Sequence, residues 1–87
     1  MITVKFANGE VHSCPHLATI PNQQMAFVAL DDVSFAEASA IFADENKTCI
    51  MEYGEYRLVG YTNLLYVMKE SYGYKACLTG GYDERIS

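Results

Sequence analysis

Apolar and polar side chains alternate on both sides of an Asn8-Gly9 pair in the segment ITVKFANGEVHSC. Asn-Gly is a preferred pair for a two-residue type I′ hairpin turn, because both central residues need a positive φ. This turn predicts a register in which Lys5 lies opposite His12. One face of the predicted hairpin then carries Ile2, Val4, Phe6 and Val11, and the other carries Thr3, Lys5, His12 and Cys14.

The next two segments predict a loop and then a strand. PHLATIPNQQ contains both prolines of the chain together with polar amides, which indicates an irregular connector. MAFVALDD is a short apolar run bounded by that connector and by acids, with Phe27 and Val28 at its middle. Such a run is typical of a buried strand.

The spacing of apolar residues changes to that of a helix in VSFAEASAIFADEN. Ser34, followed three residues later by Glu37, is a capping box, which satisfies two backbone donors at the start of a helix. The apolar side of the following turns consists of Phe35, Ala38, Ile41 and Phe42. We predict a helix over residues 34–43.

A second hairpin is predicted in TCIMEYGEYRLVGY, with Gly54-Glu55 as a two-residue type II′ turn. This register sets Glu52 opposite Arg57, and cross-strand pairs of opposite charge stabilise a ladder. The other predicted opposite pairs are Tyr53 with Tyr56, Met51 with Leu58 and Ile50 with Val59.

A third hairpin is predicted in TNLLYVMKESYGYKACLTG, where Tyr72-Gly73 is a suitable turn. It sets Glu70 opposite Lys75. A three-residue loop would instead oppose Lys69 and Lys75, a like-charge pair that destabilises a ladder, so the shorter turn is favoured.

The resulting order is β-β-β-α-β-β-β-β. We predict an α+β fold, with a mostly antiparallel sheet of about six to seven short strands built from hairpins and one short helix over 34–43. A partly closed sheet is equally compatible. We expect a single domain over residues 1–79 and a frayed tail over residues 80–87, because GGYDERIS is rich in glycine and charge.

Charge excludes several classes of partner. The chain has 87 residues and a net charge of −5, and its six basic residues form no cluster. Nucleic-acid binding needs lysines and arginines that neutralise phosphates, so we expect neither nucleic acid nor a membrane surface as a partner. The three cysteines are widely spaced, and no signal peptide or membrane-spanning run is evident, which predicts a cytoplasmic protein with reduced thiols.

The segment EVHSCPHLA holds His12, Cys14 and His16, and it suggests a small metal- or ligand-binding module. We consider this the second hypothesis. Structural zinc requires four ligands in recognisable pairs, and the other cysteines are isolated. In the predicted register Lys5 stands opposite His12, and a neighbouring ammonium disfavours a divalent cation. We therefore expect no metal and no cofactor.

Catalysis has weaker candidates still. The acid pairs Asp31-Asp32 and Asp44-Glu45 could supply general acids or bases, but both flank the predicted helix, where acids commonly support a helix start or a solvated turn. Cys14 has no evident group to position a base beside it. We expect no enzymatic activity and no catalytic residues.

The tyrosines point to protein contacts. All seven fall in the last 35 residues, and Tyr53, Tyr56, Tyr72 and Tyr74 flank two predicted turns. Tyrosine is common in strands, but it is also enriched at protein interfaces. The runs TCIMEY and NLLYVM contain few charged residues. A sheet edge without charged side chains can pair with another strand. We expect these four tyrosines to contact protein subunits, and we expect a homo-oligomer.

The layout of ITVKFANGEV, SFAEASAIF, ENKTCIMEY and YTNLLYVMKESYGYKACL resembles small β-rich proteins encoded in phage and prophage genomes, among genes for virion and tail parts. The resemblance covers Met1 to about Leu78 and carries no functional residues over. It implies a non-enzymatic structural or assembly protein, made in the host cytoplasm and incorporated in a virion.

Overall fold

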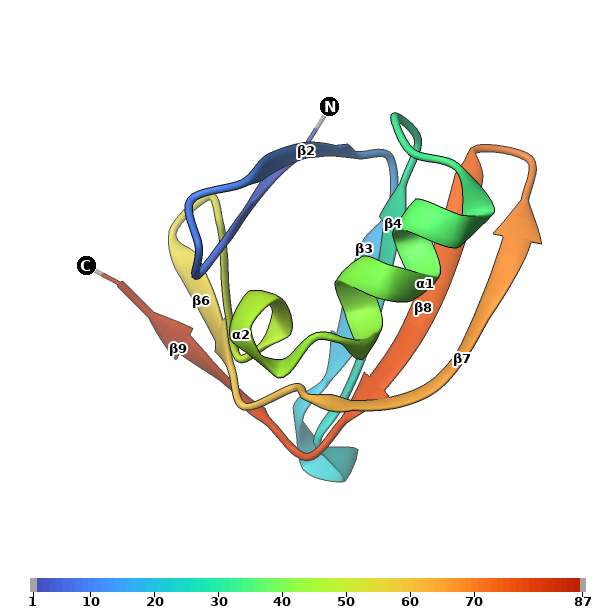
Figure 1. The fold of residues 1–87 in the computed structure, drawn as a ribbon. Coiled ribbons are helices and arrows are strands. Elements are labelled where there is room, and N and C mark those ends of the chain that lie inside the picture. Colours follow the sequence, from blue (N-terminus) through green and yellow to red (C-terminus); the bar gives the residue numbers. More distant parts are fainter. Residues whose placement is uncertain (1, 87) are drawn as a thin grey trace.

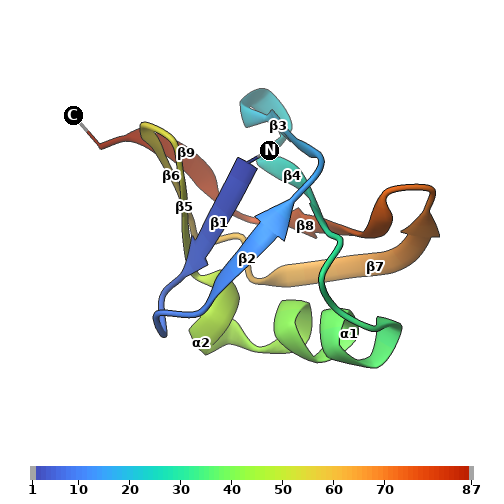
Figure 2. The same ribbon diagram turned by 90° about the horizontal axis from the view of Figure 1, so that it is seen from above.

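A computed structural model describes residues 2–86 and shows an α+β fold of nine strands in two antiparallel sheets (Figures 1 and 2). Sheet A has the order β2-β1-β5-β6-β9, and sheet B has the order β3-β4-β8-β7. The strands are β1 Ile2–Phe6, β2 Val11–Cys14, β3 Leu17–Ile20, β4 Met25–Leu30, β5 Ile50–Tyr53, β6 Tyr56–Val59, β7 Asn63–Glu70, β8 Gly73–Thr79 and β9 Tyr82–Arg85. The helices are α1 Phe35–Ala43, α2 Glu45–Thr48 and the short 3₁₀ helix η1 Pro21–Gln23. The predicted fold class is confirmed, although the strands outnumber the expected six to seven.

Two of the extra strands lie in segments that we predicted to be irregular. The connector contains β3, which pairs with β4. The expected frayed tail contains β9, which pairs with β6 over four residues. Both corrections have the same cause, since each short strand is held by pairing that its own local sequence does not reveal. Met1 and Ser87, which the predicted ranges include, lie outside the described residues.

The chain passes from one sheet to the other at Pro15 and again at a corner built from glycines. β6 and β9 pair in sheet A, and their continuations β7 and β8 pair in sheet B. The bend of this ribbon brings together Gly60, Gly80 and Gly81. A side chain on Gly81 would clash with the Val59 carbonyl oxygen and come within 2.7 Å of the Tyr61 ring. Glycine at 81 thus permits the close approach that the corner requires.

The first hairpin has a register one residue away from the predicted one. Val4 lies opposite His12, and the amide of Phe6 donates to the Glu10 carbonyl oxygen at 2.9 Å. The loop therefore has three residues, ending at Gly9 with φ of 93°. A one-residue shift moves the second strand's side chains to the other face. Cys14 consequently lies on the inner face, fully buried, and Val11 is exposed.

The second hairpin has the predicted register throughout. The third turns one residue earlier than predicted, so that Glu70 lies opposite Gly73. The faces are unchanged, because the shift alters the pairing by two residues. Glu70 still reaches Lys75 diagonally, with 3.3 Å between its carboxylate and the ammonium. Gly73 is required at its position, because a side chain there would clash with the Leu30 carbonyl oxygen at the end of β4.

The predicted helix is confirmed as α1, which begins after Ser34. The Ser34 hydroxyl accepts the Glu37 amide at 3.2 Å. Asp44 ends α1 and caps α2, where its carboxylate accepts the Asn46 amide at 3.0 Å. The acids that follow α1 therefore stand at a helix start, where negative charge is favourable.

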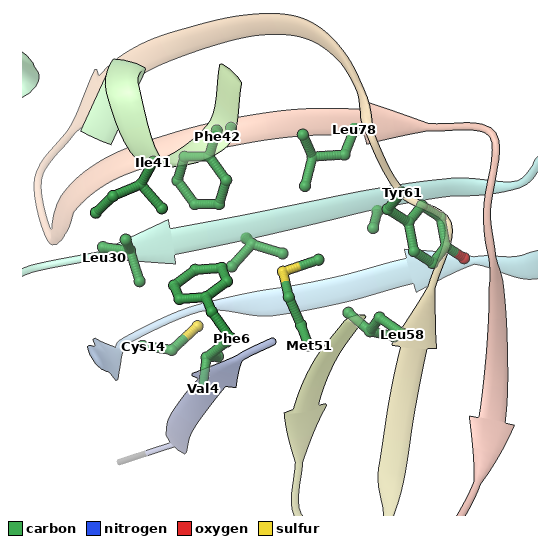
Figure 3. Packing of buried hydrophobic residues seen from close by; sticks show 13 residues of the cluster. Val4, Phe6, Cys14, Leu30, Ile41, Phe42, Met51, Leu58, Tyr61 and Leu78 are labelled. Carbon is green, nitrogen blue, oxygen red and sulfur yellow. The ribbon is translucent and has the colours of Figure 1, made fainter. Parts of the chain in front are cut away.

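The hydrophobic core fills the space between the inner faces of the two sheets and α1 (Figure 3). Side chains from both sheets meet there with Ile41 and Phe42 of α1. The core residues from the sheets and the corner are Val4, Phe6, Cys14, Ala26, Val28, Leu30, Met51, Leu58, Tyr61, Ala76 and Leu78. Ile2, Leu17, Tyr53, Leu64 and Val67 are partly buried and pack against this core, and alternation along each strand places their sequence neighbours on the outer faces of the sheets.

Candidate interaction surface

The structure does not bring His12, Cys14 and His16 together. The His12 imidazole, whose side chain is 14% exposed, lies 3.4 Å from the Asp32 carboxylate. The Cys14 thiol donates to the His16 carbonyl oxygen at 3.1 Å, whereas the exposed His16 ring lies beside Tyr72. Among residues 2–86, no three His, Cys, Asp or Glu side chains are grouped so that they could hold a metal ion.

Cys14 also lacks the chemistry of a nucleophile. Burial raises the pKa of its thiol above the ordinary value. A reactive cysteine needs the opposite change, since the thiolate is the nucleophile. His12 Nε2 is buried without a hydrogen-bond partner, and its ring meets Phe6 edge to face at 5.5 Å. The prediction that His12 and Cys14 lie on the face opposite Val4 and Phe6 is wrong, because the register of the hairpin differs by one residue.

The acid pairs make structural contacts. Asp32 receives the backbone amide of Ser13 at 3.5 Å, in addition to its contact with His12. Asp44 caps α2. These carboxylates therefore tie elements together where they lie, at the edge of sheet A and at the junction of the two helices.

The four tyrosines selected from the sequence flank the β5–β6 turn and the β7–β8 turn, which lie on opposite sides of the molecule (Figure 2). The rings of Tyr53 and Tyr56 stack at the β5–β6 turn, with 5.7 Å between their centroids. At the β7–β8 turn, Tyr72 lies beside His16, and Tyr74 lies 5.6 Å from Phe35 at the start of α1. They do not form one continuous surface.

An open pocket of about 340 Å³ lies on sheet A. Its polar lining comes from Lys5, Glu52 and Arg57, which are cross-strand neighbours on the outer face. The Arg57 guanidinium contacts the Glu52 carboxylate at 3.1 Å. Because Glu52 already neutralises one of the two cations, the pocket offers little attraction for an anion.

The outer face of sheet B has a different composition. Its cross-strand rows place Phe27 beside Cys77 and Tyr66, and Ala29 beside Lys75 and Met68. We call the apolar members of this face the sheet B patch. The sheet B patch consists of Ala18, Ile20, Met25, Phe27, Ala29, Tyr66, Met68 and Cys77.

One ion pair interrupts the sheet B patch. The Lys75 ammonium contacts Glu70 and also lies 5.6 Å from the centroid of the Phe27 ring. Hydrogen bonding to Glu70 raises the pKa of Lys75. The Lys75 ammonium therefore stays charged and makes a cation–π contact with the Phe27 ring, so the ion pair is in contact with the patch that it interrupts.

The edge strands of the two sheets differ in whether other parts of the chain contact them. At the β2 edge, the Asp32 carboxylate receives the Ser13 amide. The β3 and β9 edges are joined by a hydrogen bond from the Thr19 hydroxyl to the Asp83 carboxylate, which also accepts the Tyr61 hydroxyl at 2.7 Å. β7 is the other edge of sheet B, and within residues 2–86 no strand pairs with its outer side.

Part of this surface was visible in the sequence. NLLYVM was expected to form an unguarded edge, and it forms most of β7. The other proposed edge, TCIMEY, contains β5, which lies inside sheet A between β1 and β6. Phe27 was predicted to lie in a buried strand, and nothing in its local sequence distinguishes the outer face of a central strand from the inner face.

Over residues 2–86, no helix has the length and apolar character needed to cross a membrane. Comparison of the chain with models of known protein families, with curated proteins and with solved structures finds no match.

Proposed function

We propose that this chain is a non-enzymatic structural or assembly protein that self-associates or docks on other subunits through the sheet B patch and the adjoining β7 edge. The observation that carries the proposal is the position of the apolar patch beside an open edge. Contiguous apolar patches on soluble chains commonly mark contact surfaces.

The exposed side chains at this place have the chemistry of an interface. Tyr66 and Met68 are large, exposed and adjacent along the outer face of β7, and Leu65 projects from a bulge beside them. Tyrosine and methionine are enriched at protein interfaces, where lysine and glutamate are depleted. Because the layout of the sequence resembles small β-rich phage and prophage proteins, we propose that the chain takes part in the assembly of a phage or prophage particle.

Tyr66 and Tyr82 form a matched pair for a test. Each is an exposed tyrosine on a strand, 42% exposed on sheet B and 54% exposed on sheet A. We expect sedimentation equilibrium, from low micromolar to a few hundred micromolar, to show an oligomer for the wild type and for Tyr82→Glu. Tyr66→Glu should be monomeric and keep its far-UV circular dichroism spectrum. A wild-type chain that is monomeric at every concentration would rule out self-association.

A further inference from the structure

We infer that two copies of this chain pair through β7, antiparallel and about a two-fold axis at Met68, so that sheet B continues from one copy into the other. This inference rests on the proposed function and names the partner as a second copy. It follows from the edge, from the regular part of β7 and from the charges along it.

The edge supplies the backbone groups. β7 is the longest strand, with eight residues, and only its β8 side is paired within residues 2–86. An edge strand presents unpaired N–H and C=O groups that match those of another strand. In a symmetric dimer each contact is made twice by the same surface, so β7 would meet β7 of the second copy.

A continuous sheet restricts the possible registers. Residues opposite each other must lie on the same face, and the ladder of β7 with β8 is irregular between Leu64 and Tyr66. The regular part is therefore Tyr66–Glu70. An axis at Met68 uses this part fully, placing Tyr66 opposite Glu70 and Val67 opposite Lys69 of the second copy.

The neighbouring registers fit less well. An axis at Lys69 would oppose two ammonium groups, and like charges directly opposite each other destabilise a ladder. Axes at Val67 or Tyr66 would draw the Leu65 bulge into the new ladder. Charge also favours a second copy, because β7 and its β8 neighbour carry Lys69, Glu70 and Lys75, whereas the whole chain has a net charge of −5. Two copies therefore meet here with little of the repulsion expected elsewhere.

The register can be tested by disulfide formation in a Cys49→Ser background, which removes the partly exposed native thiol. Directly opposite residues have Cα atoms roughly 4.5 to 5.5 Å apart, within the range that a disulfide spans. We expect Met68→Cys to give a cross-linked dimer on mild oxidation. Lys69→Cys is the matched control, since the two copies of residue 69 would be offset by two residues, roughly 7 Å along the strands.

A second variant tests the same axis without a cysteine. Met68→Lys places two ammonium groups opposite each other, and we expect it to raise the dimer dissociation constant at least about tenfold. Met68→Leu should retain the dimer. A dimer that survives Met68→Lys, and that cross-links no better through residue 68 than through residue 69, would overturn the inference and leave the proposed self-association intact. A monomeric wild type would overturn both.

Discussion

The outer faces of the two sheets differ in composition. On sheet A, one row across four strands carries Lys5, Glu52, Arg57 and Glu84, so that opposite charges alternate. On sheet B, the equivalent central rows carry apolar side chains around one ion pair. Charged rows are stable in water, whereas an apolar face gains free energy when it is covered. This contrast is the basis for proposing sheet B, and not sheet A, as the side through which the chain associates.

The edges repeat this contrast. Near the corner, Asp83 accepts hydrogen bonds from Thr19 and Tyr61, and it joins β9 of sheet A to β3 of sheet B. β7, at the far side of sheet B, has no such bridge within the described residues. The corner therefore supplies internal stability and the β7 side is available for association, so substitutions on the two sides should affect different measurements.

The largest effect on stability is expected for Gly81→Ala at the corner. The new methyl group would clash with the Val59 carbonyl oxygen and the Tyr61 ring, both held by the bend. We expect a loss of about 3 kcal/mol or more in the free energy of unfolding, measured by urea denaturation. Gly9→Ala is the control, because nothing lies within 4 Å of the place that its new methyl group would occupy, and only its positive φ is unfavourable. Equal losses for the two variants would contradict the close approach at the corner.

Tyr61→Phe should have a smaller effect that depends on pH. The hydroxyl donates to Asp83, and its removal should cost about 2 kcal/mol near neutral pH. Burial, together with the hydrogen bond to Asp83, raises the pKa of Tyr61 above its ordinary value of 10.0. Above about pH 10 the unfolded chain loses this proton while the folded chain keeps it, so stability should fall as the pH rises.

Urea denaturation at a series of pH values separates these two contributions of Tyr61. The wild type should lose stability on the alkaline side, and Tyr61→Phe should lose less, because phenylalanine has no proton to release. If both proteins have the same stability at neutral pH and the same alkaline slope, the hydrogen bond contributes nothing to closing the corner.

The sequence predicted much of the fold where local signals decide the structure. The Gly54-Glu55 turn and the cap at Ser34 act over a few residues. The turn gives the predicted register, and the Ser34 hydroxyl accepts the Glu37 amide. The register at Asn8-Gly9 was wrong because the same pair also suits a three-residue loop with a positive φ at the glycine. This difference of one residue in loop length determines which face of the sheet carries His12 and Cys14.

The corner could not be predicted from local signals. The glycines before Tyr82 indicated a frayed end, whereas their small size lets β9 reach sheet A. Asp83 acquires its hydrogen-bond donors only because Thr19 and Tyr61, distant in sequence, arrive at the same place. Likewise, strand order decides that NLLYVM is an edge and TCIMEY is not, and no local pattern specifies strand order.

Thiol reactivity should show the contrast between the sheets with little change in stability. Cys77 lies opposite Tyr66 on the outer face of sheet B, whereas Cys14 lies on the inner face of sheet A. With Ellman's reagent we expect one thiol, the partly exposed Cys49, to react in the native wild type. Tyr66→Ala should add Cys77 as a second.

Cys14 should remain protected in both proteins, because burial raises its pKa and only the thiolate reacts readily. Tyr82→Ala is the matched control, since its cross-strand neighbour is Val59 and no cysteine is uncovered. Complete unfolding in denaturant should release all three thiols. Should Cys77 stay unreactive in Tyr66→Ala, its protection comes from the strands themselves, and the outer face of sheet B is more closed than its exposed side chains indicate.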